Sequence, residues 1–182
     1  MFISYKYRLY PNKKQQEYFA KCFGCVRFIY NRMLSDKIEY YKETKQKLNN
    51  YPAQYKTEFP WLKEVDSYAL SNAQMNLQKA YNNFFNRPEV GFPKFKSKKN
   101  NYFSYTTNND IRKNNGKGSI LISNRQIKLP KIGWIKIKKH RDLNGLIKSV
   151  TISKNTKWKI LCICISRNRI CTHSICRMYG WD

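Results

Sequence analysis

The chain has 182 residues, and its 36 lysines and arginines against 11 aspartates and glutamates give a formal net charge of +25. This length allows one domain or two small ones with a sizeable core, and the lack of any apolar run of about 18 residues excludes a membrane-spanning helix. The opening residues, MFISYKYRLYPNKK, have no apolar core of a signal peptide, so we expect a cytoplasmic protein in which disulfides are rare.

The charge excess indicates the class of partner. A protein with so much unbalanced positive charge repels itself unless it binds a polyanion, and the release of counterions favours nucleic acid. An A/T-rich genome would also enrich Lys, Asn, Ile and Tyr, but it would not explain the shortage of acidic residues. Together with the 15% aromatic residues, the charge predicts nucleic-acid binding.

Residues 1–10 alternate in character. Apolar side chains at Ile3, Tyr5, Tyr7 and Leu9 face one way, which predicts a half-buried strand whose basic side chains face outward. Pro11 ends this strand, and the following asparagine can cap a helix that begins near residue 13.

From residue 13 to about residue 47 the apolar period becomes helical, with a break predicted at Gly24. Two helices around a glycine-containing turn form a helix-turn-helix in the loose sense, and an ordinary packed helical hairpin is favoured over a DNA-reading one. Cys22 and Cys25 form a C-x-x-C with no second pair at zinc-finger spacing, so both are interpreted as small packing residues.

A connector with two prolines occupies residues 49–66, after which Ser67 can cap a third helix. An apolar stripe at helical spacing follows it, made of Leu70, Ala73, Leu77, Ala80, Tyr81 and Phe84. The Arg87–Pro88 pair ends this helix.

Residues 94–141 contain 14 lysines and arginines but only one acid, Asp110. Short strands separated by Asn, Gly and Pro replace the helical period here: YFSYT, SILIS, RQIKLP, WIKIKKH and IKSVTISK. The fold class predicted is therefore α+β, a small basic β-barrel that resembles an oligonucleotide-binding fold, with a helical lobe inserted after the first strand. A lysine-rich sheet edge that only blunts aggregation is the alternative.

Several stretches, in this order, resemble the N-terminal half of TnpB (OrfB) proteins, the transposase-type proteins of insertion sequences that are related to type V CRISPR nucleases. The resemblance covers residues 3–157, and its most specific part is GFPKFKSKK (91–99) followed by LPKIGWIKI (129–137). It implies that residues 1–10 and 94–157 form the wedge barrel and that residues 11–93 form the recognition lobe. Together these parts would bind a guide RNA derived from the element, and target DNA.

The residues predicted to contact nucleic acid are mainly basic. Tyr105 and Trp134 are predicted either to stack on bases or to lie in the core, with the core favoured for Trp134. The complete set is Lys6, Arg8, Lys94, Lys96, Lys98, Lys99, Tyr105, Trp134, Lys136, Lys138, Lys139 and Arg141.

The resemblance also implies a nuclease domain after the wedge, with three carboxylates that hold two metal ions, and often a four-cysteine zinc ribbon. The eleven acids of this chain contain no group of three in a suitable context. We therefore expect a chain truncated before the nuclease domain, with no catalytic residues, no metal site and no cofactor.

Residues 158–182 differ from the rest because they contain Cys162, Cys164, Cys171, His173 and Cys176. These spacings match no common zinc ribbon, and we favour neither a zinc site nor a disulfide knot. A set of codons that can encode residues 158–163 gives Gly-Lys-Tyr-Tyr-Val-Ser when it is read from one base later. This is the strand that the family resemblance leads us to expect. The final Gly-Trp-Asp becomes Val-Gly-Ile followed by an acid, which resembles the family's first catalytic motif. We therefore interpret residues 158–182 as out of frame, and the encoding DNA tests this interpretation.

The main functional prediction is thus a transposon-encoded protein that binds guide RNA and DNA without nuclease activity. Two alternatives stay open. One is a sequence-specific helix-turn-helix regulator of the element, which would need a sequence-specific DNA footprint. The other is a non-functional pseudogene product, which hydrogen exchange or circular dichroism would reveal as unfolded.

Overall fold

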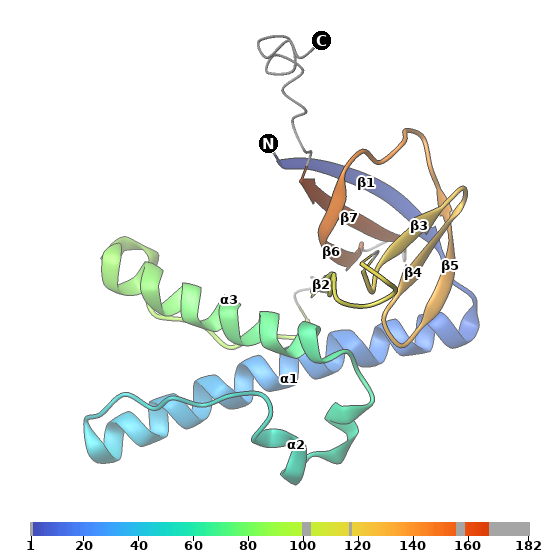
Figure 1. Cartoon of the computed structure of the whole chain (residues 1–182). Helices are drawn as coiled ribbons and strands as arrows, with labels where there is room; N and C mark the ends of the chain where they lie inside the picture. The colour runs from blue at the N-terminus through green and yellow to red at the C-terminus, as the bar shows by residue number, and fades with distance from the viewer. Residues whose placement is uncertain (1, 100–102, 117, 156–158, 168–182) are drawn as a thin grey trace, which may run out of the picture.

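The computed structural model describes residues 2–99, 103–116, 118–155 and 159–167. They form an α+β fold in which a helical segment is inserted between the first and second strands of one antiparallel sheet (Figure 1). In chain order the elements are β1 (Phe2–Tyr10), α1 (Lys13–Thr44), α2 (Tyr55–Glu58), the 3-10 turn η1 (Pro60–Lys63), α3 (Ser67–Asn86), the 3-10 turn η2 (Pro88–Val90), β2 (Phe103–Asn108), β3 (Leu121–Ser123), β4 (Gln126–Leu129), β5 (Gly133–Lys138), β6 (Leu146–Lys154) and β7 (Ile160–Arg167).

The first strand follows its alternating sequence. In β1 the side chains of Tyr5, Tyr7 and Leu9 are buried, whereas those between them are exposed. The predicted half-buried strand with outward basic groups is therefore confirmed.

Helix α1 begins as predicted but does not break at Gly24. The Asn12 side chain accepts a hydrogen bond from the Gln15 amide at 2.9 Å, and the Gln15 side chain accepts one from the Asn12 amide at 3.0 Å, which completes a capping box. The helix then continues for 32 residues, so the predicted turn is wrong. A helical glycine costs only about 1 kcal/mol relative to alanine, and buried residues on both sides, from Phe19 to Leu34, hold the helix in one piece.

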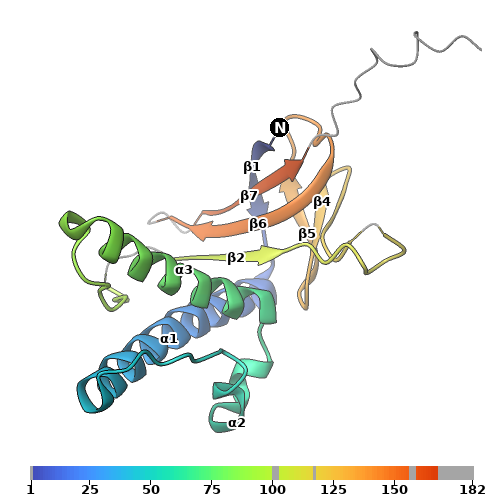
Figure 2. The ribbon, with the colours of Figure 1, turned by 60° about the vertical axis from the view of Figure 1, so that its left-hand side comes forward.

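Helix α3 packs beside α1 and connects the helices to the sheet. Its N-cap is Asp66 rather than the predicted Ser67, since the Asp66 carboxylate accepts from the Tyr68 amide at 3.3 Å. The Asn72 side chain donates to the Thr106 carbonyl of β2 at 2.9 Å. Figure 2 shows β2 between α3 and the rest of the sheet. None of the helices in the described part of the chain is long and apolar enough to cross a membrane.

The strands form one antiparallel sheet in the order β2-β6-β7-β1-β5-β4-β3. Among the described residues β2 and β3 are its two edges, so the predicted closed barrel is wrong. Closure needs a backbone ladder between these edges, and β3 has only three residues. Side chains instead link the segment that follows β2 to the one that precedes β3: the Asn109 carbonyl oxygen (Oδ1) accepts from the Ile120 amide at 2.8 Å, and the Ser119 hydroxyl accepts from the Asp110 amide at 3.0 Å.

The last described strand lies within the segment interpreted as out of frame. β7 pairs with β1 on one side and with β6 on the other, and it places Cys162 and Cys164 in the core beside Tyr5 and Tyr7. An alternating strand is also what the shifted reading of these codons gives, so β7 is compatible with either frame. Residues 168–182 lie outside the described residues.

Candidate nucleic-acid interface

Four of the cations predicted to contact nucleic acid lie together on the outer face of two neighbouring strands. In the antiparallel β1–β5 pair, Arg8 lies opposite Lys138, and Tyr10 lies opposite Lys136. Lys6 shares this face because it is two residues from Arg8 on the same strand. All of these side chains are exposed. We call the four cations Lys6, Arg8, Lys136 and Lys138 the basic sheet face.

The charges on this face are not balanced within the described structure. None of its four cations forms an ion pair with a carboxylate of residues that the structure describes. Arg8 and Lys138 are like charges directly opposite each other, an arrangement that destabilises a sheet. The Arg8 guanidinium lies 5.0 Å from the centroid of the Tyr10 ring. The phosphates of a bound nucleic acid would relieve this repulsion. The Tyr10 ring would then lie beside the nucleic-acid backbone.

The two predicted aromatics fall in different environments. Trp134 is 42% exposed on β5 because Ile135 and Ile137 take the inward positions of that strand, although the sequence favoured the core for it. Tyr105 is 5% exposed, and its ring centroid lies 5.7 Å from that of Phe23. The structure therefore leaves the Trp134 ring available for stacking and places Tyr105 in the core.

Lys139 and Arg141 follow β5 and are engaged with the protein itself. Lys139 forms an ion pair with Asp142. The Arg141 guanidinium donates to the Ser4 carbonyl at 2.6 Å and lies 4.6 Å from the centroid of the Tyr5 ring. The Arg141 contacts hold the β5–β6 connection against β1, at the margin of the basic sheet face, whereas the Lys139 ion pair lies within the connection.

The predicted cations at 94, 96, 98 and 99 lie elsewhere, in the segment before β2 that contacts α1 through Lys96. The Asn31 side chain donates to the Lys96 carbonyl at 2.9 Å and accepts from the Lys96 amide at 2.8 Å. The Lys96 ammonium lies 4.2 Å from the centroid of the Tyr30 ring, and partial desolvation lowers the pKa of this lysine. We call residues 94–99 the lysine segment. The structure thus divides the predicted cations between two surfaces.

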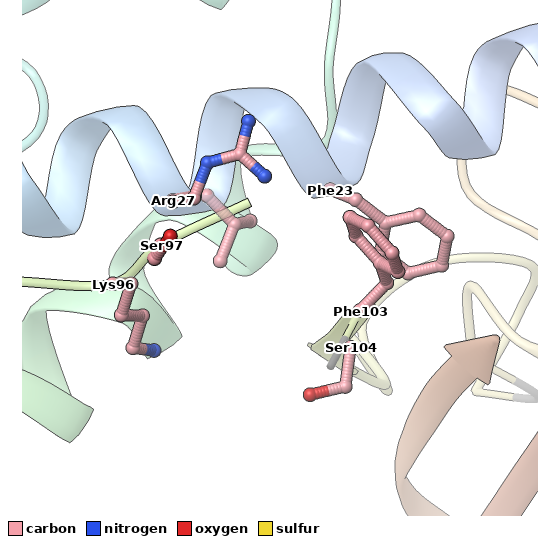
Figure 3. A pocket seen from close by; sticks show the side chains of 7 residues that line it. Phe23, Arg27, Lys96, Ser97, Phe103 and Ser104 are labelled. Atoms are coloured by element: carbon pink, nitrogen blue, oxygen red, sulfur yellow. The ribbon is translucent and has the colours of Figure 1, made fainter. Parts of the chain in front are cut away.

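A pocket of about 220 Å³ opens between α1, the lysine segment and the start of β2. Figure 3 shows Arg27, Lys96 and Ser97 on one side of it and Phe23, Phe103 and Ser104 on the other. Val26 completes the lining, which contains two cations and no carboxylate. This combination of aromatic and cationic walls suits a nucleotide better than a purely apolar ligand.

Most of this pocket was not predicted from the sequence. Of its lining residues only Lys96 was predicted, because the walls come from segments about seventy residues apart in the chain. One local signal was present: Arg27 follows Phe23 by four residues on a helix whose neighbouring positions are buried.

The cysteines that the structure describes are packing residues. Cys22 and Cys25 are free and buried, as predicted, and burial raises the pKa of the Cys22 thiol to about 12 and that of Cys25 to about 11. A hydrogen bond with Cys162 and burial raise the pKa of Cys164. In the described ranges no group of three metal-ligating side chains is close enough to hold an ion. Cys171, His173 and Cys176 lie outside them.

The N-terminal region of the chain matches a known protein family. A family model described as a helix-turn-helix domain, that of the OrfB proteins of IS605-type elements, matches residues 1–46. In this chain those residues form β1 and the uninterrupted helix α1.

Three curated proteins are similar over longer stretches. A protein of Escherichia coli (strain K12) named as an RNA-guided DNA endonuclease, InsQ, is 29% identical over 98% of this chain and 44% of its own length. A protein of Streptomyces pristinaespiralis named as an RNA-guided DNA endonuclease is 32% identical over 53% of this chain and 25% of its own length. The virulence protein VsdF of Salmonella dublin is 33% identical over 54% of this chain and 95% of its own length. The chain thus spans less than half the length of either protein named as an endonuclease.

Proposed function

Since the chain belongs to the TnpB (OrfB) family of insertion-sequence proteins, we propose that it binds a guide RNA derived from its element and helps to hold target DNA. The observation that carries this proposal is the pair of like charges, Arg8 and Lys138, that face each other on adjacent strands without a described carboxylate partner. Such an arrangement is stabilised by a polyanion.

The lysine segment extends the proposed interface onto the helices. Lys94, Lys98 and Lys99 are exposed there, and the Asn31 hydrogen bonds fix the backbone between them. A strand of RNA that crossed the sheet could therefore meet a second group of cations, in the lysine segment beside α1. Phosphate contacts of this kind position nucleic acid without reading its sequence, which fits a protein whose specificity comes from a guide.

We further propose that residues 1–182 bind without cutting. Cleavage by a two-metal mechanism needs several carboxylates converging on the ions. In the described structure Asp36, Glu58, Glu64, Asp110 and Asp142 form ion pairs with lysine or arginine. No described acids gather into a metal-holding group.

The interpretation of residues 158–182 as out of frame also remains a proposal. The encoding DNA tests it: the plus-one frame after residue 158 should continue into a long open frame with further acidic motifs. A stop codon soon after the shift would contradict it.

Direct binding and cleavage assays test the proposed function. We expect the purified chain to bind fluorescent RNA from the end of its element and to leave supercoiled plasmid intact in Mg²⁺ or Mn²⁺. Failure to bind RNA at low salt would contradict the binding proposal, and metal-dependent nicking by a preparation of the pure chain would contradict the second proposal.

A further inference from the structure

We propose that the pocket between α1, the lysine segment and β2 binds one unpaired nucleotide of the nucleic acid that the basic surfaces hold. This inference rests on the proposed function. It assigns a distinct task to residues that the basic sheet face does not include. A base would lie against the aromatic side, and its phosphate would lie on the cationic side.

The size of the pocket limits what it can hold. Pockets that bind drug-sized molecules enclose about 300–1,000 Å³, whereas this one encloses about 220 Å³. A single base or nucleotide is the unit of a polynucleotide that approaches this size. A paired base cannot offer its face to a side chain, so the nucleotide must be splayed out of any helix.

The aromatic side is built from two rings on different elements. Phe23 comes from α1 and Phe103 from the start of β2, and their ring centroids lie 6.0 Å apart with planes inclined at 48°. Phe23 is 6% exposed, whereas Phe103 is only partly buried. Phe103 is therefore the more accessible of the two rings, and we assign the contact with the base to it.

The cationic side has free donors. Arg27 forms no ion pair or side-chain hydrogen bond with any residue in the described ranges, and it is only partly exposed. Lys96 is held beside it by the two hydrogen bonds of Asn31. The hydroxyl of Ser97 on this side, and that of Ser104 on the aromatic side, add groups that can donate to phosphate or base oxygens. With no carboxylate in the lining, an anionic ligand meets no repulsion there.

Two of the walls belong to regular secondary structure. Phe103 lies opposite Lys154 in the β2–β6 ladder, and the Lys154 ammonium lies 5.3 Å from the centroid of its ring. Arg27 projects from the middle of a long continuous helix. The backbone at these two positions is already ordered and loses little conformational freedom on binding, which favours affinity.

Photo-crosslinking on the full chain tests the inference. The probes are a single-stranded oligo-uridine RNA of about 12 nucleotides, a length typical of single-strand sites, with 5-iodouridine in place of uridine, and the matching DNA. Crosslinked peptides are identified by mass spectrometry, and affinity is measured in parallel by fluorescence anisotropy. The variants are Arg27→Gln and Phe103→Leu. Arg87→Gln is the control, because it removes the same charge from the exposed C-cap of α3.

We expect a crosslink at Phe103 with at least one probe, and the stronger of the two identifies the nucleic acid bound. Arg27→Gln should reduce this crosslink at least fivefold more than Arg87→Gln does. Phe103→Leu should abolish it while affinity falls by about tenfold or less. Crosslinks confined to Tyr10 and Trp134 with tight binding would overturn the pocket inference and leave the proposed function standing. No binding of either probe would overturn the pocket inference, whereas the proposed function is overturned only if the RNA from the end of the element is not bound either.

Discussion

The side chain of Asn31 binds both polar backbone atoms of Lys96, accepting from its amide at 2.8 Å and donating to its carbonyl at 2.9 Å. One side chain on α1 thereby fixes a segment 65 residues further along the chain. No strand ladder holds the lysine segment in the described part of the chain, so this contact helps to set where the segment lies.

Replacing Asn31 by alanine should release the lysine segment without unfolding the protein. The Lys96 amide loses its acceptor, so its hydrogen exchange should accelerate at least about fivefold, as expected for the loss of about 1 kcal/mol. Hydrogen exchange measured by NMR checks this. Asn76→Ala is the matched control, since Asn76 is exposed on α3, and it should leave the Lys96 amide protected. Unchanged exchange in Asn31→Ala would contradict the contact.

Gly24→Ala should stabilise the protein by about 1 kcal/mol. The glycine lies in the interior of α1 with no heavy atom within 4 Å of an added Cβ, so alanine gains helix propensity without a clash. Gly133→Ala should have the opposite effect, since φ is +79° there and an L-residue is strained by about 1–2 kcal/mol. Denaturant midpoints of the two variants provide the measurement. A destabilising Gly24→Ala would mean that α1 is not continuous at this residue.

Stability should fall as the pH rises above about 8.5, the ordinary pKa of a cysteine thiol. Burial raises the pKa of Cys22 to about 12 in the folded protein. Between these values the unfolded chain loses a proton that the folded chain keeps, so the free energy of unfolding decreases by up to about 1.4 kcal/mol per pH unit. The stabilisation is fully present below pH 8.5 and is lost toward pH 12.

A Cys22→Ala variant tests this assignment. Its unfolding free energy between pH 8.5 and 10 should have a shallower slope than that of the parent, whatever the cost of the smaller side chain at neutral pH. Urea titrations at several pH values measure the slopes. Identical slopes would show that the Cys22 thiol does not titrate differently in the two states.

Much of the fold could be predicted because it depends on local patterns. The alternation of Ile3, Tyr5, Tyr7 and Leu9 fixes which face of β1 is buried, and Asn12 followed by Gln15 fixes the start of α1. The break expected at Gly24 does not occur, because tertiary packing outweighs the low helix propensity of a single glycine. The prediction of a closed barrel was wrong because closure depends on the pairing of β2 with β3, which no local sequence pattern specifies.

The site could be predicted only in part, for the same reason. The alternation around Trp134 placed Lys136 and Lys138 on an outer face, and the structure pairs that strand with Arg8. The docking of the lysine segment on Asn31, and the pocket beside Arg27, arise from contacts between distant segments. Residue type alone identifies cations, but only the packed chain shows which cations share a surface.

The measurement that tests the central claim most directly is the salt dependence of RNA binding, followed by anisotropy of a labelled single strand from about 50 to 300 mM salt. Neutralising two phosphate contacts should make the slope of log K against log salt less steep by about 1.4. We expect this change for Arg8→Gln/Lys138→Gln. We expect no change for Lys42→Gln/Lys79→Gln, which removes the same charge from exposed helix positions outside both surfaces. An unchanged slope in the first variant, or equal changes in both, would contradict a phosphate-binding role for the basic sheet face.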